Sequence, residues 1–278
     1  MGRQENIEIF EDTEKLCKTN DKLKASIQNS RKNQKLILEN DELSIDENAL
    51  NKYITPAKVV VSQKRSFDAA KSYKGKKVCV LNFASATNPG GGVTKGSTAQ
   101  EECLCRCSTL YFNLNTKEMW DGFYSPHRNT ANPLHNDDII YTPSVTVFKS
   151  DTANPTLLPE SDWYNVNVVT CAAPNLREKP SNRMNMNDGN KAVKISDKEL
   201  LHLHEKRIKR ILDVAVKEGN EAVILGAFGC GAFANSPCIV ARAAKNVIQN
   251  YLYAFETIEF AIYCSAMDQT NYNTFKNM

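Results

Sequence analysis

The sequence predicts a layered α/β domain built on a mixed or parallel sheet. From about residue 57, short β-rich segments alternate with helical patterns, an order typical of a sheet covered by helices. Three of the six candidate strands are almost wholly apolar, as expected of strands that are buried on both faces. Two of the strands run into glycine-rich loops that precede helices.

The candidate elements follow from the spacing of the apolar residues. The first fifty residues are polar and helix-prone, with a short candidate strand at 36–38. Residues 197–217 carry leucine and isoleucine at helical spacing, and Pro237 is placed for the first turn of a later helix. The candidate strands are 58–62, 76–83, 139–148, 166–172, 222–228 and 257–264, and the candidate helices are 98–114, 197–217 and 237–253.

Length and charge bound the domain organisation and the partners. The chain has 278 residues, with 35 Lys+Arg against 32 Asp+Glu and a net charge of +3. Residues 1–77 hold 16 basic and 12 acidic side chains, so the rest of the chain carries a net charge of −1. A dedicated nucleic-acid binder usually shows a basic stripe. The main body has no obvious stripe of this kind, which argues against direct nucleic-acid binding. We expect a monomer in which residues 1–56 form an N-terminal extension packed on an α/β domain at 57–278.

The cysteines and the hydropathy suggest a cytoplasmic protein, or a nuclear one in a eukaryote. Nine cysteines are scattered along the chain, several within apolar runs, which is typical of reduced, buried thiols. Of Cys103, Cys105 and Cys107, only the first and last share a helix face, and no histidine lies nearby, so we expect no metal site. We also expect no cofactor. No run approaches the roughly 18 apolar residues that span a bilayer, and no signal peptide is recognisable.

Ligands of such sheets bind outside the carboxyl ends of strands, where residues 81–92 and 225–235 form the two glycine-rich loops. Missing side chains let backbone amides approach an anion, and a following helix N-terminus adds a favourable dipole. Neither loop matches the Walker or Rossmann glycine spacing. The glycines could simply allow tight strand-to-helix turns, but two such loops favour a ligand that carries a diphosphate between sugars.

Two adjacent carboxyl groups follow the first loop. Glu101 stands at capping-box spacing from Thr98, so a bond back to the Thr98 amide is an alternative to a chemical role. The side chain of Glu102 would point about 100° around the helix from that of Glu101, so it would have no capping role. A carboxyl that is partly desolvated beside a bound ligand has a raised pKa, and such a group can act as a general acid on a glycosidic bond.

Other candidate residues have weaker support. Cys230 lies in the second glycine loop but has no neighbouring histidine to activate it, so a nucleophilic role is disfavoured. Lys95 either meets a phosphate or is solvated. His202 and His204 lie in a polar helix start, and we interpret these two side chains as solvated or locally bonded. His127 and His135 fall in a polar loop. Residues 179–196 read as a polar surface loop.

The glycine and glutamate motifs together resemble a known family. Asn88-Pro-Gly-Gly-Gly92, seven intervening residues and Gln100-Glu-Glu102 resemble the GGG…QEE signature of poly(ADP-ribose) glycohydrolases. The flanking motifs resemble the microbial-type branch and recur in order between about residues 57 and 265. They are Val80-Leu-Asn-Phe-Ala-Ser85, Arg106-Cys-Ser-Thr-Leu-Tyr111, Tyr141-Thr-Pro-Ser-Val145 with Phe148, Ala172-Ala-Pro-Asn175 and Gly226-Ala-Phe-Gly-Cys-Gly-Ala-Phe-Ala-Asn235.

The resemblance implies a three-layer α/β/α macrodomain with a mixed central sheet and an N-terminal extension. It also implies a hydrolase that cleaves the ribose–ribose O-glycosidic bond of poly(ADP-ribose) and releases ADP-ribose, with ADP-ribosylated proteins as partners. Glu102 would protonate the leaving hydroxyl and then deprotonate water, and Glu101 would hold the ribose hydroxyls. Substrate-binding positions carried over from the family are Asn88, Gly90, Gly91, Gly92 and Gln100 near the distal ribose, Gly229, Cys230, Gly231 and Ala232 around the diphosphate, and Phe233 on the distal ribose.

Two positions depart from the family pattern, and two other functions stay open. Ala234 stands where glycine is common in the family, and Phe228 where tryptophan is common. Both lie beside the implied ligand positions, so we expect these departures to change the ligand affinity more than the chemistry. The same fold could read ADP-ribose without turnover, or hydrolyse single ADP-ribose units from a conjugate. The intact Gln100-Glu101-Glu102 favours an enzyme, because a binding module does not need paired carboxyls beside the glycines.

Overall fold

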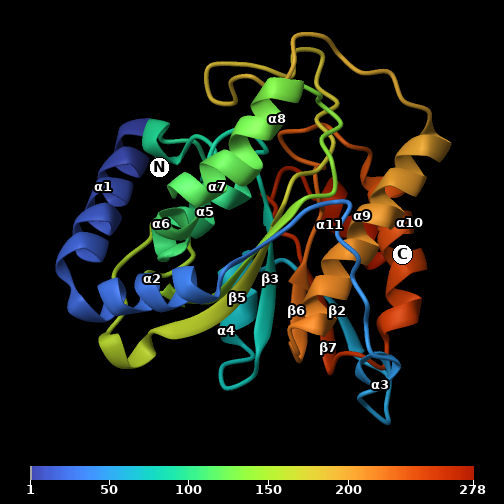
Figure 1. Cartoon of the computed structure of the whole chain (residues 1–278), viewed down its shortest axis with the longest axis horizontal. Helices are drawn as coiled ribbons and strands as arrows, with labels where there is room; N and C mark the ends of the chain where they lie inside the picture. The colour runs from blue at the N-terminus through green and yellow to red at the C-terminus, as the bar shows by residue number, and fades with distance from the viewer. Residues whose placement is uncertain (1) are drawn as a thin grey trace.

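A seven-stranded mixed sheet organises the chain in a computed structural model that describes residues 2–278. The strand order is β1-β4-β5-β3-β6-β7-β2. Strand β4 runs antiparallel to both β1 and β5, and the remaining neighbours are parallel (Figure 1). The strands are β1 (Lys35–Ile37), β2 (Lys58–Ser62), β3 (Val78–Phe83), β4 (Ile139–Val147), β5 (Tyr164–Cys171), β6 (Ala222–Leu225) and β7 (Thr257–Ala261).

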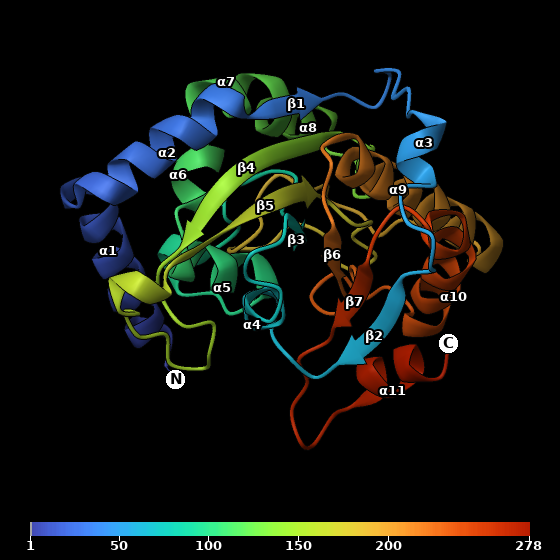
Figure 2. The same cartoon turned by 90° about the horizontal axis from the view of Figure 1, so that it is seen from below.

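Helices cover both faces of the sheet, so the predicted three-layer α/β/α architecture is confirmed (Figure 2). One face carries α3 (Glu47–Leu50), α9 (Asp197–Lys217), α10 (Pro237–Ile248) and α11 (Thr270–Lys276). The other face carries α4 (Ser66–Lys71), α5 (Gln100–Cys107), α6 (Leu110–Leu114), α7 (Lys117–Met119), α8 (Ser125–Thr130), α1 (Arg3–Thr19) and α2 (Asp21–Asn33).

The central strand β3 shows why the sequence has an apolar run here. Val78 and Val80 pack into the core beside α4 and α5, while Cys79 and Leu81 pack into the core beside α9 and α10. Successive side chains of a strand point to opposite faces. Because both faces are covered, the four positions from Val78 to Leu81 are all apolar, and the buried Asn82 that follows is hydrogen-bonded.

The first 37 residues contact the main body at several points. Thr13 donates a hydrogen bond from Oγ1 to the carbonyl of Arg106 (2.6 Å), and Ser30 donates from Oγ to the carbonyl of Ser144 (3.1 Å). Strand β1 pairs with β4 at the edge of the sheet, with Leu36 opposite Ile140. Strand β1 lies within the predicted extension 1–56 but belongs to the same sheet as β2–β7. The division of the chain at residue 56 therefore remains a prediction.

Two predicted helices have different ends in the structure. The predicted helix 98–114 is split into α5 and α6, because Ser108 adopts an extended conformation (φ −149°, ψ 178°) and forms a β-bridge with Val147. Its hydroxyl donates to the carbonyl of Leu104 (2.8 Å), which ends α5. Helix α10 ends at Ile248 and continues as a 3₁₀ turn. Helix α9 and strand β2 have the predicted bounds.

Residues 179–196 form neither helix nor strand, as predicted, and run along the top of Figure 1 into α9. Within the described part of the chain, no helix is both long and apolar enough to cross a membrane. The nine cysteines are free thiols, as expected from their scattered placement.

Candidate active site

A pocket of about 570 Å³ opens at the carboxyl ends of β3, β6 and β7. This volume is typical of small-molecule sites. Both glycine loops line the pocket, together with the start of α5 and part of the 179–196 loop. A second hollow of about 620 Å³, between α1 and residues 149–157, contains none of the residues that the sequence singled out. We therefore build the candidate site in the first pocket.

Glu101 points back to β3 and does not cap its own helix. Its Oε1 accepts a hydrogen bond from Nδ2 of Asn82 (3.1 Å), and its Oε2 accepts one from the backbone N–H of Ser85 (2.8 Å). The cap residue of α5 is Ala99, which makes no side-chain hydrogen bond. The capping-box interpretation of Glu101 is therefore wrong: tertiary donors on β3 and the first loop hold this carboxyl.

Glu102 lies beside Glu101 with one oxygen held and the other free. Its Oε1 accepts a hydrogen bond from the backbone N–H of Gly92 (2.8 Å). Its Oε2 is buried and has no hydrogen-bond partner, and the residue lines the pocket. A buried carboxyl oxygen without a partner is costly, so this atom is the one left for a proton or a ligand group.

The first loop approaches these carboxyls closely because it has no side chains there. A Cβ on Gly91 would lie 2.5 Å from Oε1 of Glu102, and the backbone at Gly91 is left-handed (φ +59°). A Cβ on Gly92 would meet the hydroxyl of Ser97. Glycine satisfies both the space and the conformation, so the turn and the carboxyl contact depend on the same residue type.

Burial raises the pKa of both glutamates. Burial, reinforced by the charge of Glu102, raises the pKa of Glu101 to about 8 against the hydrogen bonds from Ser85 and Asn82. Burial likewise raises the pKa of Glu102, opposed by the N–H of Gly92. Two adjacent buried carboxyls resist simultaneous ionisation, so the pair retains a proton near neutral pH. This is the protonation state that a general acid requires.

The second glycine loop forms the opposite side of the pocket, which Gly229, Gly231, Ala232 and Phe233 line. Asn235 holds this loop: its Nδ2 donates to the carbonyls of Pro174 (2.6 Å) and Gly229 (3.0 Å). Its Oδ1 lies 2.8 Å from Nε2 of His204 on α9. His204 is fully buried, so the expectation of a solvated histidine is wrong, because α9 turns this position toward the loop.

The structure brings most of the predicted residues together in the pocket. Gln100 lines it and is fixed to β3, with Nε2 donating to the carbonyl of Leu81 (2.7 Å) and Oε1 accepting from the N–H of Phe83 (2.9 Å). Three predicted residues lie behind the pocket wall. Gly90 lies against Tyr111, Asn88 accepts a hydrogen bond from Arg128 (2.5 Å), and Cys230 packs against the core.

Two candidates with weaker support, Cys230 and Lys95, have surroundings that do not favour the roles considered for them. Burial raises the pKa of the Cys230 thiol to about 12, which does not suit a nucleophile at neutral pH. Lys95 donates from Nζ to the carbonyl of Arg183 (2.9 Å). Among residues 2–278, no group of three or more His, Cys, Asp or Glu side chains is placed to hold a metal ion.

Several residues that the sequence did not single out also line the pocket. Tyr263 follows β7, is 57% exposed, and has the guanidinium of Arg65 4.1 Å from its ring centre. A single tyrosine near the end of a predicted strand is common, so nothing in the sequence around Tyr263 marks it as a pocket residue. Others are Arg177 and, in the 179–196 loop, Asn182, Met184 and Asn185.

The fold and the site define a class of protein. Glycine loops at the carboxyl ends of strands suit a diphosphate held by backbone N–H groups. A pair of carboxyls with a retained proton suits acid–base chemistry on a glycosidic bond. The chain has the architecture of an α/β enzyme that acts on a sugar–diphosphate compound.

Comparison with known proteins identifies the family. Residues 3–150, more than half of the chain, match the catalytic domain of microbial-type PARG, poly(ADP-ribose) glycohydrolase. The crystal structure of PARG from Thermomonospora curvata is 27% identical and covers 98% of both chains with a TM-score of 0.82. Its complex with the inhibitor ADP-HPD has a TM-score of 0.81 at the same identity and coverage.

A PARG structure from Deinococcus radiodurans in complex with ADP-ribose is 30% identical, covers 90% of this chain and 96% of its own, and has a TM-score of 0.75. No curated protein sequence matched the chain. The chain belongs to the microbial-type poly(ADP-ribose) glycohydrolase family.

Proposed function

We propose that Glu102 is the general acid and base with which this glycohydrolase cleaves the ribose–ribose O-glycosidic bonds of poly(ADP-ribose). The observation that carries the proposal is the unpartnered, buried Oε2 of Glu102 in the pocket. The oxygens of Glu101, in contrast, are both engaged by donors. Membership of the family supports the substrate class, and the Deinococcus radiodurans relative, solved in complex with ADP-ribose, supports ADP-ribose as a ligand.

The two carboxyls divide the work. Oε2 of Glu102 carries the proton and gives it to the leaving ribose oxygen as the C–O bond breaks, so that an oxocarbenium-like charge develops on the anomeric carbon. The resulting carboxylate takes a proton from a water molecule, whose oxygen forms the new bond to that carbon. ADP-ribose leaves and Glu102 is protonated again. Glu101, oriented by Asn82 and Ser85, holds ribose hydroxyls.

The ligand's diphosphate and rings fit the other walls. We assign the backbone N–H groups of Gly231 and Ala232 to the diphosphate and Phe233 to the distal ribose, because all three residues line the pocket. Three aromatic side chains line the pocket, and two of them, Phe83 and Phe233, pack against other rings. We assign Tyr263, the most exposed of the three, to stack on the adenine.

A Glu102→Gln variant tests the assignment, because the amide keeps the size and the Gly92 contact but cannot supply the proton. Turnover of labelled poly(ADP-ribose) should fall about 10²–10⁴-fold, while calorimetric affinity for ADP-ribose stays within about threefold. Glu118→Gln on α7 is the matched control, since Glu118 is exposed. Undiminished turnover by Glu102→Gln would show that another group is the acid. Running a mono-ADP-ribosylated protein in parallel tells polymer cleavage from removal of single units.

The partners and the location are part of the same proposal. We expect a cytoplasmic monomer that acts on poly(ADP-ribose) and on ADP-ribosylated proteins and does not bind nucleic acid directly. The free thiols support a reducing compartment, since five of the nine cysteines are buried in the core. Backbone recognition of one diphosphate suits a main body without a basic stripe.

A further inference from the structure

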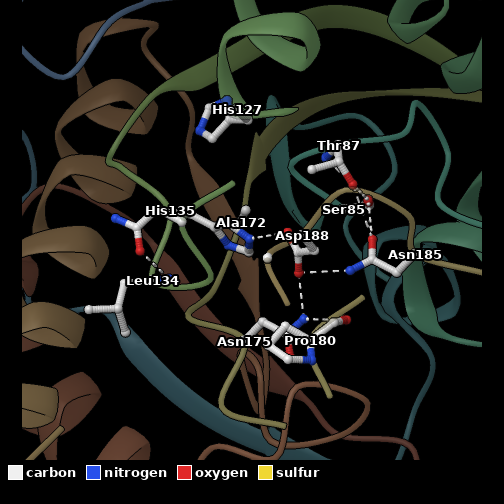
Figure 3. Close-up of polar contacts among 12 residues, drawn as sticks. Ser85, Thr87, His127, Leu134, His135, Ala172, Asn175, Pro180, Asn185 and Asp188 are labelled. Atoms are coloured by element: carbon white, nitrogen blue, oxygen red, sulfur yellow. Dashed lines mark hydrogen bonds and ion pairs between the residues drawn. The ribbon is translucent and has the colours of Figure 1, made fainter. Parts of the chain in front are cut away.

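The polar loop 179–196 contains a buried carboxylate, Asp188, whose side chain is 1% exposed. Figure 3 shows it at the centre of a cluster formed by His135, Asn175 and Asn185. Oδ1 of Asp188 lies 2.6 Å from Nε2 of His135. Oδ2 accepts hydrogen bonds from Nδ2 of Asn185 (2.7 Å) and from Nδ2 of Asn175. Burying a charge is costly unless it is paired and hydrogen-bonded, and this carboxylate is both.

Both ring nitrogens of His135 lie beside acceptor oxygens. Nδ1 lies 2.7 Å from the carbonyl oxygen of Ala173, which can only accept, and Nε2 faces the carboxyl group of Asp188. The two side chains therefore form a buried, directly contacting pair. Burial would raise the pKa of Asp188, but the hydrogen bond and charge of His135, with Asn175 and Asn185, hold it below its ordinary value.

Backbone strain supports a tightly determined cluster. His135 has a φ of +57°, in the left-handed region that residues other than glycine rarely adopt. Such a conformation costs about 1–3 kcal/mol and persists only where the surroundings over-determine it. The two ring contacts of His135 are surroundings of that kind.

The cluster reaches the catalytic carboxyls through the first glycine loop. Oδ1 of Asn185 accepts a hydrogen bond from Oγ of Ser85 (2.8 Å), and the backbone N–H of Ser85 donates to Oε2 of Glu101 (2.8 Å). Three contacts thus connect Asp188 with Glu101 by way of Asn185 and Ser85 (Figure 3 shows the first two).

The same cluster reaches the second glycine loop. The ring centre of His135 lies 5.8 Å from that of Phe233, and Oδ1 of Asn175 accepts a hydrogen bond from Nε of Arg177 (3.1 Å). The guanidinium of Arg177 lies 5.7 Å from the Phe233 ring centre. Phe233 is therefore supported from two sides by residues that depend on Asp188 or its partners.

We infer that Asp188 is a positioning residue of the glycohydrolase reaction, which, paired with His135, seats the 179–196 loop so that Asn185 and Phe233 hold the two sides of the pocket. The inference rests on the proposed function of this pocket. Asp188 is behind the pocket wall and acts through Asn185, Ser85 and Phe233. Removing its charge should loosen the loop and misplace Glu101, while the rest of the fold keeps its packing.

Asp188→Asn is the informative variant, since it keeps the shape but removes the charge. Its amide nitrogen would face either the Nδ2 donors of Asn175 and Asn185 or the N–H of His135, so one contact becomes donor against donor. We expect kcat to fall at least about tenfold, by more than KM rises, because a catalytic group is misplaced. Tryptic cleavage after Arg183 should become at least about tenfold faster under conditions in which the variant is still folded.

The matched control is Met186→Ala, a side chain of the same loop that is 44% exposed and outside the cluster. It should keep wild-type turnover and cleavage. Wild-type kcat and wild-type tryptic cleavage in Asp188→Asn would overturn the inference. Should Asp188→Asn fail to fold, Asn185→Ala makes the same comparison, because it removes the contacts to both Asp188 and Ser85, and wild-type behaviour of that variant would equally overturn it.

The two proposals can fail separately. Glu102→Gln should leave tryptic cleavage after Arg183 unchanged, since Glu102 makes no contact with the loop's cluster. Full turnover by Glu102→Gln with fast cleavage of Asp188→Asn would contradict the catalytic assignment alone. Loss of turnover in Glu102→Gln with wild-type Asp188→Asn would contradict the positioning role alone.

Discussion

The backbone N–H of Gly92 donates a hydrogen bond to Oε1 of Glu102 at 2.8 Å. This contact joins the first glycine loop to the first turn of α5, so the loop that lines the pocket also orients the carboxyl that we propose as the acid. With Oε1 held, Oε2 is the buried oxygen without a hydrogen-bond partner. In the proposed mechanism, ligand binding and acid catalysis therefore depend on the same few backbone atoms.

Gly91→Ala should abolish most of the activity without unfolding the protein. The new Cβ would lie 2.5 Å from Oε1 of Glu102, in a backbone with φ of +59°. Because the carboxyl must move, we expect kcat to fall about 10²-fold. Gly75→Ala is the matched control, since Gly75 also has positive φ (+99°) but open space around it. It should lower the unfolding midpoint slightly and leave kcat intact, and equal losses in both variants would refute the steric explanation.

Turnover should decline as the pH rises above neutral, because burial raises the pKa of Glu102 and the proposed acid is lost once its proton leaves. Stability has the same direction. The unfolded chain releases the proton of Glu101 near the ordinary value of 4.5, while the folded chain keeps it to about 8, so stability falls as pH rises across this window. Glu101→Gln should therefore be more stable than wild type at pH 9 and nearly equal at pH 4. Urea unfolding at the two pH values measures this, and a difference of opposite sign would contradict the assignment.

Ala234→Gly should stabilise the protein by about 0.5–1 kcal/mol. Ala234 has a φ of +57°, so its Cβ is strained in a backbone region that glycine adopts freely. Relief of that strain outweighs the extra entropy of glycine in the unfolded chain. Thermal unfolding measures the gain. The same change at Ala222, in the middle of the buried sheet with no positive φ, should be destabilising.

Arg207→Met should cost about 3–5 kcal/mol of unfolding free energy. Arg207 and Asp137 are almost fully buried, with Nε 2.8 Å from Oδ1. Nη1 of Arg207 also donates to the carbonyl of Ala172 (2.8 Å), next to strand β5. Removing the cation leaves a buried carboxylate without its main partner. Lys18→Ala, which breaks the exposed pair with Glu14, should change stability by less than about 0.5 kcal/mol. If the two variants lowered the urea midpoint by similar amounts, the explanation from burial would be ruled out.

Tyr263→Ala should weaken ADP-ribose binding by about 1–3 kcal/mol, the usual value of a base stacked on an aromatic ring. Turnover at saturating substrate should be nearly preserved, because the adenine takes no part in the bond that is cleaved. Tyr253→Ala, an exposed tyrosine that does not line the pocket, is the control. Calorimetry with ADP-ribose and with ribose 5-phosphate separates the base from the sugar, and an equal loss for both ligands would argue against stacking.

Local patterns were sufficient to predict the layers, the strands and the two glycine loops. Buried parallel strands must be apolar on both faces, as Val78 and Cys79 of β3 are, and such runs are visible without any structure. The Glu101–Glu102 pair could also be found, since its spacing from the glycines is a property of the chain itself. The end of α5 could not, because Ser108 leaves the helix to pair with Val147, which is distant in sequence.

The polar residues of the site separate what each level determines. By itself, the sequence determined the α/β layering, the position of the glycine loops and the candidate acid Glu102, because these depend on neighbours along the chain. Only the tertiary structure decided that Glu101 bonds to Ser85 and that His135 and Asp188 form a buried pair. The free energy of a polar side chain depends on whether burial supplies it with partners, and those partners come from other parts of the chain.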